Sequence, residues 1–540
     1  MNVVQTNVDV IVVGGGLAGL VVAAELADAG KRVMLLEGQS KLGGQALWSL
    51  GGLFLVNTPE QRRLGITDSV DLALADWLAS AEFNGGANDA WARRWAQSYV
   101  EAAATDLSPW LRSMGVSFFP LVQWAERGGG PADGPGNSMP RFHVVWGTGP
   151  GLLEPFLRRV ETRQAENLID VRVAHRVEEL VMDGGRVAGC LLHNTVDERS
   201  HAVHADAVVI ATGGIGANHE LVRRWWPDTL RDAPADMLQG VPDHVDGSGL
   251  LTAQQAGAHV TNIDRMWNYP EGIAHHTPVW NAHAVRVLAG PGSLWLDARG
   301  RRLPPPLYPG VDTLRALRHL TTTGSPHSWL LCNHRIAAAE LRLSGSVHNP
   351  DLTNRSIVQL LKRALPRPAE PIQAFIDRGL DIVTADDPHT LVARMNALVG
   401  DDLIDEHELR RQVLAYDRQA ASGFGNDAQL AAISTARRYL PDRLMRTAGN
   451  QQILDPSARP LIAIRMRAFT RKSLGGLQTD LSSRVLQADG TALPGLYAAG
   501  EVAGFGGGGV HGHRSLEGTF LGGCLHTGLR AARGIQTDMS

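Results

Sequence analysis

The chain has 540 residues, of which 44% are hydrophobic and 20% are charged, and its formal net charge is -4 at pH 7. This length exceeds one ordinary hydrophobic core, so we expect a globular protein of about two to four domains. The small net charge gives no reason to expect nucleic acid or an acidic membrane surface as a partner. Three widely scattered cysteines indicate neither a disulfide framework nor a paired redox dithiol, and they fit a reducing compartment.

The N-terminal residues have neither the basic nor the apolar segment of a secretory signal. No later stretch offers the roughly 18 apolar residues that a membrane-spanning helix needs. We therefore expect a cytoplasmic protein without a membrane span.

The first unit of the chain carries a nucleotide-binding pattern. Residues 9–13 are nearly all apolar and mostly β-branched, which predicts a strand buried on both faces of a parallel sheet. Gly14, Gly16 and Gly19 follow with the G-x-G-x-x-G spacing, which allows a tight turn, close approach to a pyrophosphate and close packing of helix on strand. Small and apolar residues over 17–29 predict a helix whose amide-rich N-terminus faces the phosphates.

The residues that follow select the type of dinucleotide. Residues 33–36 predict a second parallel strand, and Glu37 at its end is placed to accept a hydrogen bond from a ribose 2′-hydroxyl. A second glycine-rich passage, over residues 41–52, comes too soon after Glu37 to be another crossover. The passage resembles the flavoprotein family that contains fumarate reductase and succinate dehydrogenase flavoprotein subunits and the 3-ketosteroid dehydrogenases. This resemblance implies FAD, with the passage lying along its pyrophosphate, ribityl chain and ring.

The first half of the chain continues with helices and strands. Residues 67–114 look helical, and we favour a core role over a pocket-lining role for their tryptophans, Trp77, Trp91, Trp95 and Trp110. The glycine- and proline-rich stretch 128–140 is either a loop that reaches over the site or only a connection. Residues 169–194 alternate as a hairpin that turns at 183–185. Residues 207–210 predict a buried strand that, by resemblance, returns beneath the cofactor. Asp246 opens a segment similar to the family's D-G-x-G signature, ahead of a helix near 250–256.

From about residue 266 to 445 the βαβ rhythm disappears. Family members carry a cap at this point, and closure of such a cap would exclude water from a hydride-transfer site. The neighbouring histidines His275 and His276 would point to opposite faces of an extended strand, and no other Cys/His cluster lies nearby in the sequence. We therefore expect no metal site.

The C-terminal run, residues 470–534, completes the resemblance. Glu501 follows a predicted returning strand and matches the glutamate that contacts the ribityl chain in the family. A glycine run and a helix to about residue 533 follow. Free amides around Gly518, Thr519 and Phe520 at the N-terminus of that helix could stabilise negative charge on the pyrimidine end of a reduced flavin.

The fold class that we predict is α/β. It consists of a discontinuous, Rossmann-like FAD-binding domain of the glutathione reductase type, over residues 1–265 and 445–540, with an inserted α+β cap over residues 266–444. The residues expected to bind the cofactor are Gly14, Gly16, Leu17, Ala18, Gly19, Glu37, Gly38, Gly43, Gly44, Gln45, Ser49, Gly51, Gly52, Val177, Ala211, Thr212, Gly213, Asp246, Glu501, Gly518, Thr519 and Phe520.

Departures from the family narrow the function. Gln45 stands where covalent members carry the histidine that tethers the flavin, so we expect non-covalent FAD. Pro309 falls at the place of the fumarate reductase proton donor. Ser515 and Lys472 replace an arginine and a histidine of its dicarboxylate clamp, although Arg514 stands beside Ser515. Fumarate and succinate are therefore not expected as substrates.

The overall pattern is closest to the 3-ketosteroid dehydrogenase-like branch. This resemblance implies dehydrogenation or reduction of a CH-CH bond next to a carbonyl in a bulky apolar ketone or enone, with hydride transfer at flavin N5 and a diffusible electron acceptor such as a quinone or oxygen. Candidates for acid, base or substrate contact are Tyr308, His511, His513 and Arg514, each with a purely structural role as the alternative. A flavin monooxygenase or oxidase, or a flavoprotein that serves only as a redox partner, stays open.

Overall fold

The computed structural model describes residues 8–127 and 137–540. The predicted opening unit is confirmed: β1 is Val10–Val13, α1 is Leu17–Asp28 and β2 is Val33–Leu36. β1 and β2 pair in parallel. The helix ends one residue earlier than expected, and Gly30, with a φ of +81°, follows in the left-handed region.

Strands from both ends of the chain share the first sheet. Its six strands have the order β20-β21-β9-β1-β2-β5. The four strands beyond the opening unit are β5 (Ile169–Arg172), β9 (Ala207–Ile210), β20 (Arg484–Leu486) and β21 (Ala492–Ala498). β20 is antiparallel to β21, whereas the other neighbours pair in parallel. Since β9 and β21 flank β1, the C-terminal residues lie beside the glycine turn.

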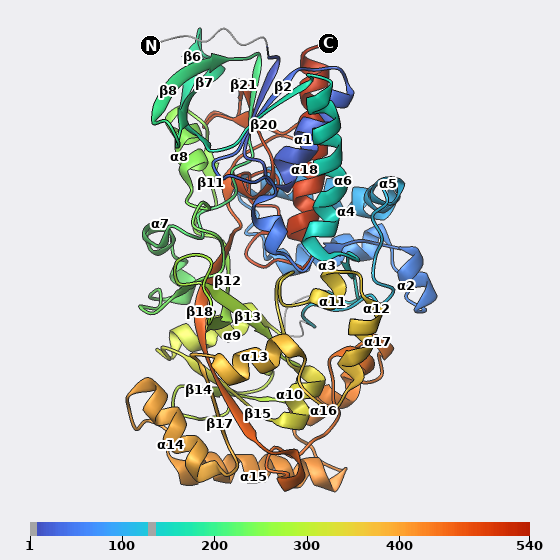
Figure 1. Ribbon diagram of the computed structural model, residues 1–540, viewed down its shortest axis with the longest axis vertical. Helices are drawn as coiled ribbons and strands as arrows, with labels where there is room; N and C mark the ends of the chain where they lie inside the picture. The colour runs from blue at the N-terminus through green and yellow to red at the C-terminus, as the bar shows by residue number, and fades with distance from the viewer. Residues whose placement is uncertain (1–7, 128–136) are drawn as a thin grey trace.

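Both faces of this sheet are covered, as the apolar run of β1 predicts. Val10 and Val12 pack against helices on one face, whereas Ile11 and Val13 pack on the other. The covering helices are α1, α6 (Thr148–Ala165) and α18 (Thr519–Asp538), which lie side by side in Figure 1. The other face carries an antiparallel sheet of β6 (His175–Asp183), β7 (Arg186–Asn194) and β8 (Arg199–His204).

The hairpin prediction is right for its turn and wrong for its first strand. β6 and β7 pair across the turn at Gly184 and Gly185. Residues 169–172, expected in the same hairpin, instead pair in parallel with β2 as β5. The run is broken at Ala174, whose φ is +57°.

The segment after β2 supplies short elements near the glycine turn and then helices. In chain order these are η1 (Gly44–Trp48), β3 (Gly52–Phe54), α2 (Pro59–Arg63), α3 (Val70–Ala81), η2 (Ala87–Asp89), α4 (Ala90–Thr105), α5 (Leu107–Ser113) and β4 (Phe142–Val144). Trp77 and Trp95 are 2% and 0% exposed in the core beside α1. The predicted loop 128–140 lies mostly outside the described residues.

The second sheet belongs to the middle of the chain, apart from its central strand. β18 (Leu461–Ser473) pairs with β10, β12, β15 and β17, and it rises from the lower part of the molecule to the upper part in Figure 1. The other strands are β10 (Leu238–Gln239), β12 (Met266–Ala274), β13 (Ala284–Leu288), β14 (Leu294–Asp297), β15 (Ser328–Asn333), β16 (Arg342–Leu343) and β17 (Ile382–Ala385).

Helices of the middle segment lie around this sheet, and several of them share a separate hydrophobic core with it. They are α9 (Thr313–Thr322), α10 (His334–Glu340), α11 (Pro350–Thr353), α12 (Ile357–Leu361), η4 (Lys362–Ala364), α13 (Glu370–Arg378), α14 (Pro388–Val399), α15 (Glu406–Ser422), α16 (Ala428–Ala436), α17 (Leu440–Met445) and η5 (Pro456–Ala458). The remaining elements are α7 (His219–Arg224), η3 (Asp228–Leu230), α8 (Ser248–Gln255), β11 (Val260–Thr261), β19 (Gly476–Leu477) and η6 (Gly500–Val502).

A loop of the middle segment, which contains Ser346 and Leu352, packs against the part of the chain that contains η1 and the start of α6. The Ser346 amide donates to the Trp48 carbonyl at 3.1 Å, and the Gly147 amide donates to the Leu352 carbonyl at 3.0 Å. The loop therefore lies against η1, whose preceding residue Gly43 pairs with Gly16 of the glycine turn. Among the described residues, every helix falls short of the length and apolarity that would let it cross a membrane.

Candidate active site

The first glycine turn leaves open space before the N-terminus of α1. A Cβ on Gly14, whose φ is +109°, would lie 2.4 Å from the Ala211 carbonyl oxygen, and a Cβ on Gly19 would lie 1.9 Å from the Gly14 carbonyl oxygen. Both positions therefore require glycine. A Cβ on Gly16 would meet nothing within 4 Å, and no side chain caps the helix. This gap in front of unpaired helix amides suits a phosphate group.

Glu37 stands at the end of β2 with its carboxylate held by two amides. Oε2 accepts from the Gly15 amide at 2.9 Å and Oε1 accepts from the Gln39 amide at 2.8 Å. The residue is 6% exposed, and a carboxylate has further lone pairs for ribose hydroxyls. Backbone hydrogen bonds thus orient Glu37 for the role that the sequence predicted.

One cavity of about 340 Å³ runs from this turn to the N-terminus of α18. The predicted cofactor residues that line it are Gly14, Gly16, Leu17, Ala18, Glu37, Gly38, Gly44, Gln45, Ser49, Gly52, Val177, Ala211, Thr212, Gly213, Glu501, Gly518 and Phe520. The other five are Gly19, Gly43, Gly51, Asp246 and Thr519, each within two residues of a lining residue. The volume is in the range of small-molecule sites.

Gln45 belongs to a buried polar group at the centre of the cavity. Its Nε2 donates to Glu501 Oε2 at 2.8 Å, and Lys472 Nζ donates to Gln45 Oε1 at 2.5 Å and to Glu501 Oε2 at 3.1 Å. Burial lowers the pKa of Lys472, although the Glu501 carboxylate opposes this shift. The carboxamide of Gln45 is no nucleophile, so this position cannot tether a flavin covalently.

The turn before α18 forms the wall of the cavity at the end that lies away from Gly14. Gly518 has a φ of +93° and its carbonyl accepts from the Phe54 amide at 3.0 Å. As in α1, no side chain caps this helix. Together the two uncapped helix ends, the glycine turns and the fixed carboxylate of Glu37 fit an FAD molecule stretched along the cavity.

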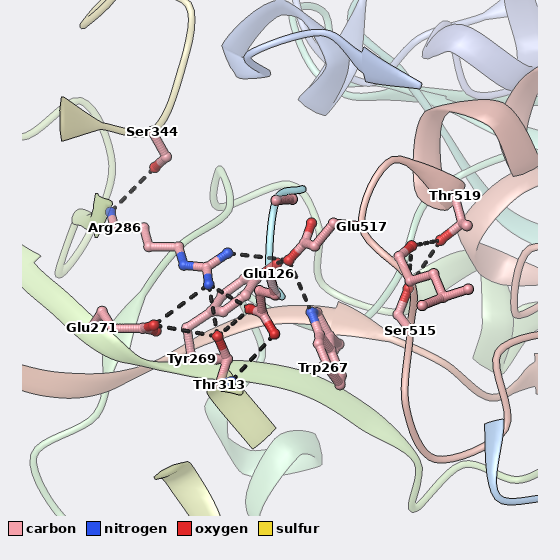
Figure 2. Close-up of polar contacts among 12 residues, drawn as sticks. Glu126, Trp267, Tyr269, Glu271, Arg286, Thr313, Ser344, Ser515, Glu517 and Thr519 are labelled. Atoms are coloured by element: carbon pink, nitrogen blue, oxygen red, sulfur yellow. Dashed lines mark hydrogen bonds and ion pairs between the residues drawn. The ribbon is translucent and has the colours of Figure 1, made fainter. Parts of the chain in front are cut away.

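Beside Gly518 lies a charged cluster that the sequence did not predict (Figure 2). Arg286 Nη1 donates to Glu517 Oε1 at 3.1 Å, and Arg286 Nη2 donates to Glu126 Oε1 at 2.7 Å and to Glu271 Oε1 at 3.5 Å. Tyr269 donates its hydroxyl to Glu517 Oε1 at 2.7 Å, and its ring lies under the Arg286 guanidinium at 3.8 Å. Of these five residues, Tyr269, Arg286 and Glu517 line the cavity.

Three carboxyl groups thus share one guanidinium in a buried place. Burial raises the pKa of Glu126 to about 7, with Arg286 opposing and Glu517 and Glu271 adding to the shift. Burial also raises the pKa of Glu271, again opposed by Arg286. Burial alone would lower the pKa of Arg286, but its acidic neighbours hold it well above the ordinary value. The cluster therefore keeps Arg286 charged and favours a proton on Glu126 near neutral pH.

The structure does not bring the four predicted catalytic candidates to the cavity wall. Tyr308 is 8% exposed, and it donates to the Ala428 carbonyl at 3.3 Å in the middle segment, where its neighbour Leu307 packs in that segment's core. Arg514 pairs with Asp312 at 2.6 Å.

The two histidines also lie behind the wall. His511 is buried and stacked on Trp77, with ring centroids 5.6 Å apart, and burial lowers its pKa to about 3. His513 lies 3.3 Å from the Asn84 side-chain nitrogen. These contacts support the structural alternatives for both histidines.

A pattern in the sequence could have indicated the missed residues. Tyr269 and Glu271 are two positions apart on β12, so they share one face of the strand. Arg286 lies on β13 opposite Gly272, next to that pair. Glu517 directly precedes the glycine that begins α18. Only the pairing of β12 with β13, and the position of α18, bring the four together.

Comparison with known proteins agrees with this geometry. Residues 9–521 match the model of the FAD binding domain family. The chain is 51% identical to the KsdD-like steroid dehydrogenase of Mycobacterium tuberculosis over 98% of this chain and 96% of that protein. It is also 51% identical to the KsdD-like steroid dehydrogenase of Mycolicibacterium smegmatis, over 99% of this chain and 100% of that protein.

Solved structures share the fold. A 3-ketosteroid Δ1-dehydrogenase from Sterolibacterium denitrificans superposes with a TM-score of 0.70 at 19% identity, over 99% of this chain and 100% of that one. A flavocytochrome c3 fumarate reductase gives a TM-score of 0.67 at 21% identity, over 99% of this chain and 79% of that one. The resemblance predicted from the glycine motifs is confirmed, and the mixed α/β fold contains an FAD-binding domain. The chain belongs to the FAD binding domain family, and within that family it is related to the KsdD-like steroid dehydrogenases.

Proposed function

We propose that the protein is an FAD-dependent dehydrogenase that oxidises a CH-CH bond next to the carbonyl of a bulky, steroid-like ketone. Its relatives at 51% identity carry the name steroid dehydrogenase. The FAD is bound without a covalent link, and the electrons pass on to a diffusible acceptor, a quinone or oxygen. We also propose the division into an FAD-binding domain, residues 1–265 and 445–540, and a cap over 266–444.

One observation carries this proposal. A single cavity joins the FAD cradle, which is formed by the glycine turn, Glu37 and the N-terminus of α18, to a lobe with an apolar wall. The wall side chains of the lobe are Leu50, Phe119, Phe142, Val144, Leu288, Leu352 and Met445. Such a wall suits a rigid hydrocarbon skeleton. The two parts meet at Glu517 and Gly518, so a substrate in the lobe would present one end to the flavin.

The residues at this junction can supply the acid-base chemistry. Bound FAD supplies the acceptor for the hydride that leaves one substrate carbon. The neighbouring carbon must lose a proton as the double bond forms, and we assign Glu517 as its acceptor, because this carboxylate lines the cavity. Tyr269 positions Glu517 through the 2.7 Å hydrogen bond, and Arg286 donates to the same carboxylate oxygen at 3.1 Å.

The test is an anaerobic titration of the yellow holoprotein with 3-ketosteroids and with smaller cyclic enones. We expect the steroids to bleach the flavin band and to yield a product with one more double bond. If no ketone bleaches the band, the dehydrogenase assignment fails in favour of a redox-partner role. A parallel aerobic assay tests the monooxygenase alternative: if substrate is hydroxylated while oxygen is consumed in equal amount, the protein is a monooxygenase instead.

A further inference from the structure

The apolar lobe of the cavity contains more positive charge than an uncharged ketone needs. Besides Arg286, the side chains of Arg342, Arg363 and Arg446 line it. Arg342 begins β16, Arg363 lies in η4 and Arg446 directly follows α17. Three separate segments thus each bring an arginine to the wall beside its apolar side chains, and the polar residues Gln123, Ser344 and Asn349 line the same cavity.

Arg363 has its own partner within the protein. Its Nε and Nη2 donate to the two Asp351 oxygens at 2.5 and 2.7 Å, and Nη2 also donates to Asn349 Oδ1 at 3.0 Å. This bidentate pair satisfies the charge of Arg363. Arg363 therefore shows how a carboxylate of the protein can satisfy an arginine of this wall, and the partners of the other two arginines can be compared with it.

Arg342 and Arg446 donate to backbone carbonyls instead. Arg342 Nη1 donates to the carbonyls of Ala338 and Leu341 at 3.2 and 2.6 Å, and Arg446 Nη1 donates to those of the 124–125 segment at 2.5 and 3.3 Å. Arg342 Nε is buried with no hydrogen-bond partner among the described residues. Carbonyl dipoles orient a guanidinium but leave its charge uncompensated, and such a buried charge is costly unless a counter-ion arrives.

The nearby carboxyl group of Glu340 does not supply that counter-ion. Glu340 is 1% exposed, and its two oxygens accept from the amides of Gly292 and Ala448 at 2.8 and 2.7 Å. Burial raises its pKa to about 7, so at neutral pH it offers only part of one negative charge. Burial and the neighbouring Arg363 lower the pKa of Arg342 to about 10, although the carboxyl groups of Asp351 and Glu340 oppose this shift.

We propose that Arg342 and Arg446 form an anion-binding end of the substrate cavity, and that the substrate is a steroid-like ketone whose side chain carries a carboxylate. The proposal rests on the proposed function for the ketone part alone. A carboxylate would complete both guanidinium groups in a water-poor wall, where charge-assisted hydrogen bonds are strong. The hydrocarbon skeleton would lie along Leu352 and Met445, and the ketone ring would reach Glu517.

The experiment compares two probes on the holoprotein under anaerobic conditions. One is a 3-keto-4-ene steroid whose side chain ends in a carboxylic acid, and the other is its methyl ester. Binding is measured by calorimetry and by the shift of the flavin band, and turnover by bleaching. We expect the acid to bind about tenfold or more tightly than the ester, and Arg342→Met and Arg446→Met each to remove that preference while ester binding stays within about twofold.

Arg443→Met is the matched control, because Arg443 is exposed on α17 and does not line the cavity. FAD content and far-UV circular dichroism report whether each variant is folded. Equal affinity for the two probes in the wild type, or an unchanged preference in both variants, overturns the anion site. If the acid binds selectively but neither probe bleaches the flavin, the proposed function fails while the anion site stands. If neither probe binds, both fail.

Discussion

The two ends of the cavity are built in different ways. The FAD end is made of backbone: Gly14 and Gly16 turn the chain, and the amides of Gly15 and Gln39 fix Glu37 from within the same unit. The proposed substrate end is made of side chains that are far apart in the sequence, since Arg286 bonds to residues 160 and 231 positions away. Backbone sites are constrained by local sterics, whereas side-chain sites depend on how distant segments meet.

The largest effect is expected at the substrate end. Glu517→Gln should slow flavin reduction by substrate by roughly 100-fold to 10,000-fold, the range for loss of a general base. Tyr269→Phe should slow it less, because the carboxylate stays in place. Stopped-flow absorbance of the anaerobic holoprotein measures both rates. The matched control is Tyr308→Phe, which should leave the rate unchanged; if it alone abolishes reduction, the assignment at this end of the cavity is wrong.

At the FAD end we expect the next largest effect from Gly16→Val. The side chain would fill the open space before α1, so FAD affinity should fall roughly 100-fold for a steric cost of about 3 kcal/mol. The fold should survive, since an added Cβ meets nothing within 4 Å. Gly86→Val is the control, because Gly86 is exposed, open around its Cβ and has a φ of -74°. FAD content after gel filtration gives the answer, and full occupancy in Gly16→Val would contradict the cradle.

A smaller effect at the same end is expected for Glu37→Gln. The amide replaces one of two oxygens that accept backbone hydrogen bonds, which leaves a donor facing a donor. We expect FAD to bind about tenfold more weakly, the cost of one buried hydrogen bond. Fluorescence quenching of FAD during reconstitution of the apoprotein measures the Kd. Glu161→Gln, on the exposed face of α6, should bind like the wild type.

The smallest effect concerns stability at the substrate end. Because the pKa of Glu126 is raised from 4.5 to about 7, the folded state holds this proton more tightly than the unfolded state. Stability from this group is therefore present below pH 4.5 and is lost as the pH rises towards 7. The Tm of the wild type should fall by roughly 2 °C more than that of Glu126→Gln between pH 5 and pH 7. Glu340 is present in both proteins, so its similar shift cancels. A Tm difference that does not change with pH would refute a proton on Glu126.

Prediction from the sequence succeeded where one residue type is sterically required. Gly14 and Gly19 permit no side chain, and Glu37 directly follows β2, which pairs with β1. The dinucleotide-binding turn could therefore be recognised from the spacing of these residues. Glu501 and Gly518 were recognised by resemblance, and they line the same cavity. The hairpin prediction erred at residues 169–172 because a short alternating strand carries no information on its partner.

By itself, the sequence determined that a dinucleotide-binding turn forms, because φ angles and close contacts at glycine are local properties of the chain, and the family resemblance of the later glycine-rich passages implied FAD. Only the tertiary structure decided which side chains line the proposed substrate end of the cavity. Tyr308 was expected near the cleft from its place in the sequence, but its hydroxyl donates to the Ala428 carbonyl away from the cavity wall. Tyr269, Arg286 and Glu517 instead meet through strand pairing and the placement of α18. Those contacts join residues from distant segments, and their free energy depends on burial and charge that exist only once the chain is folded.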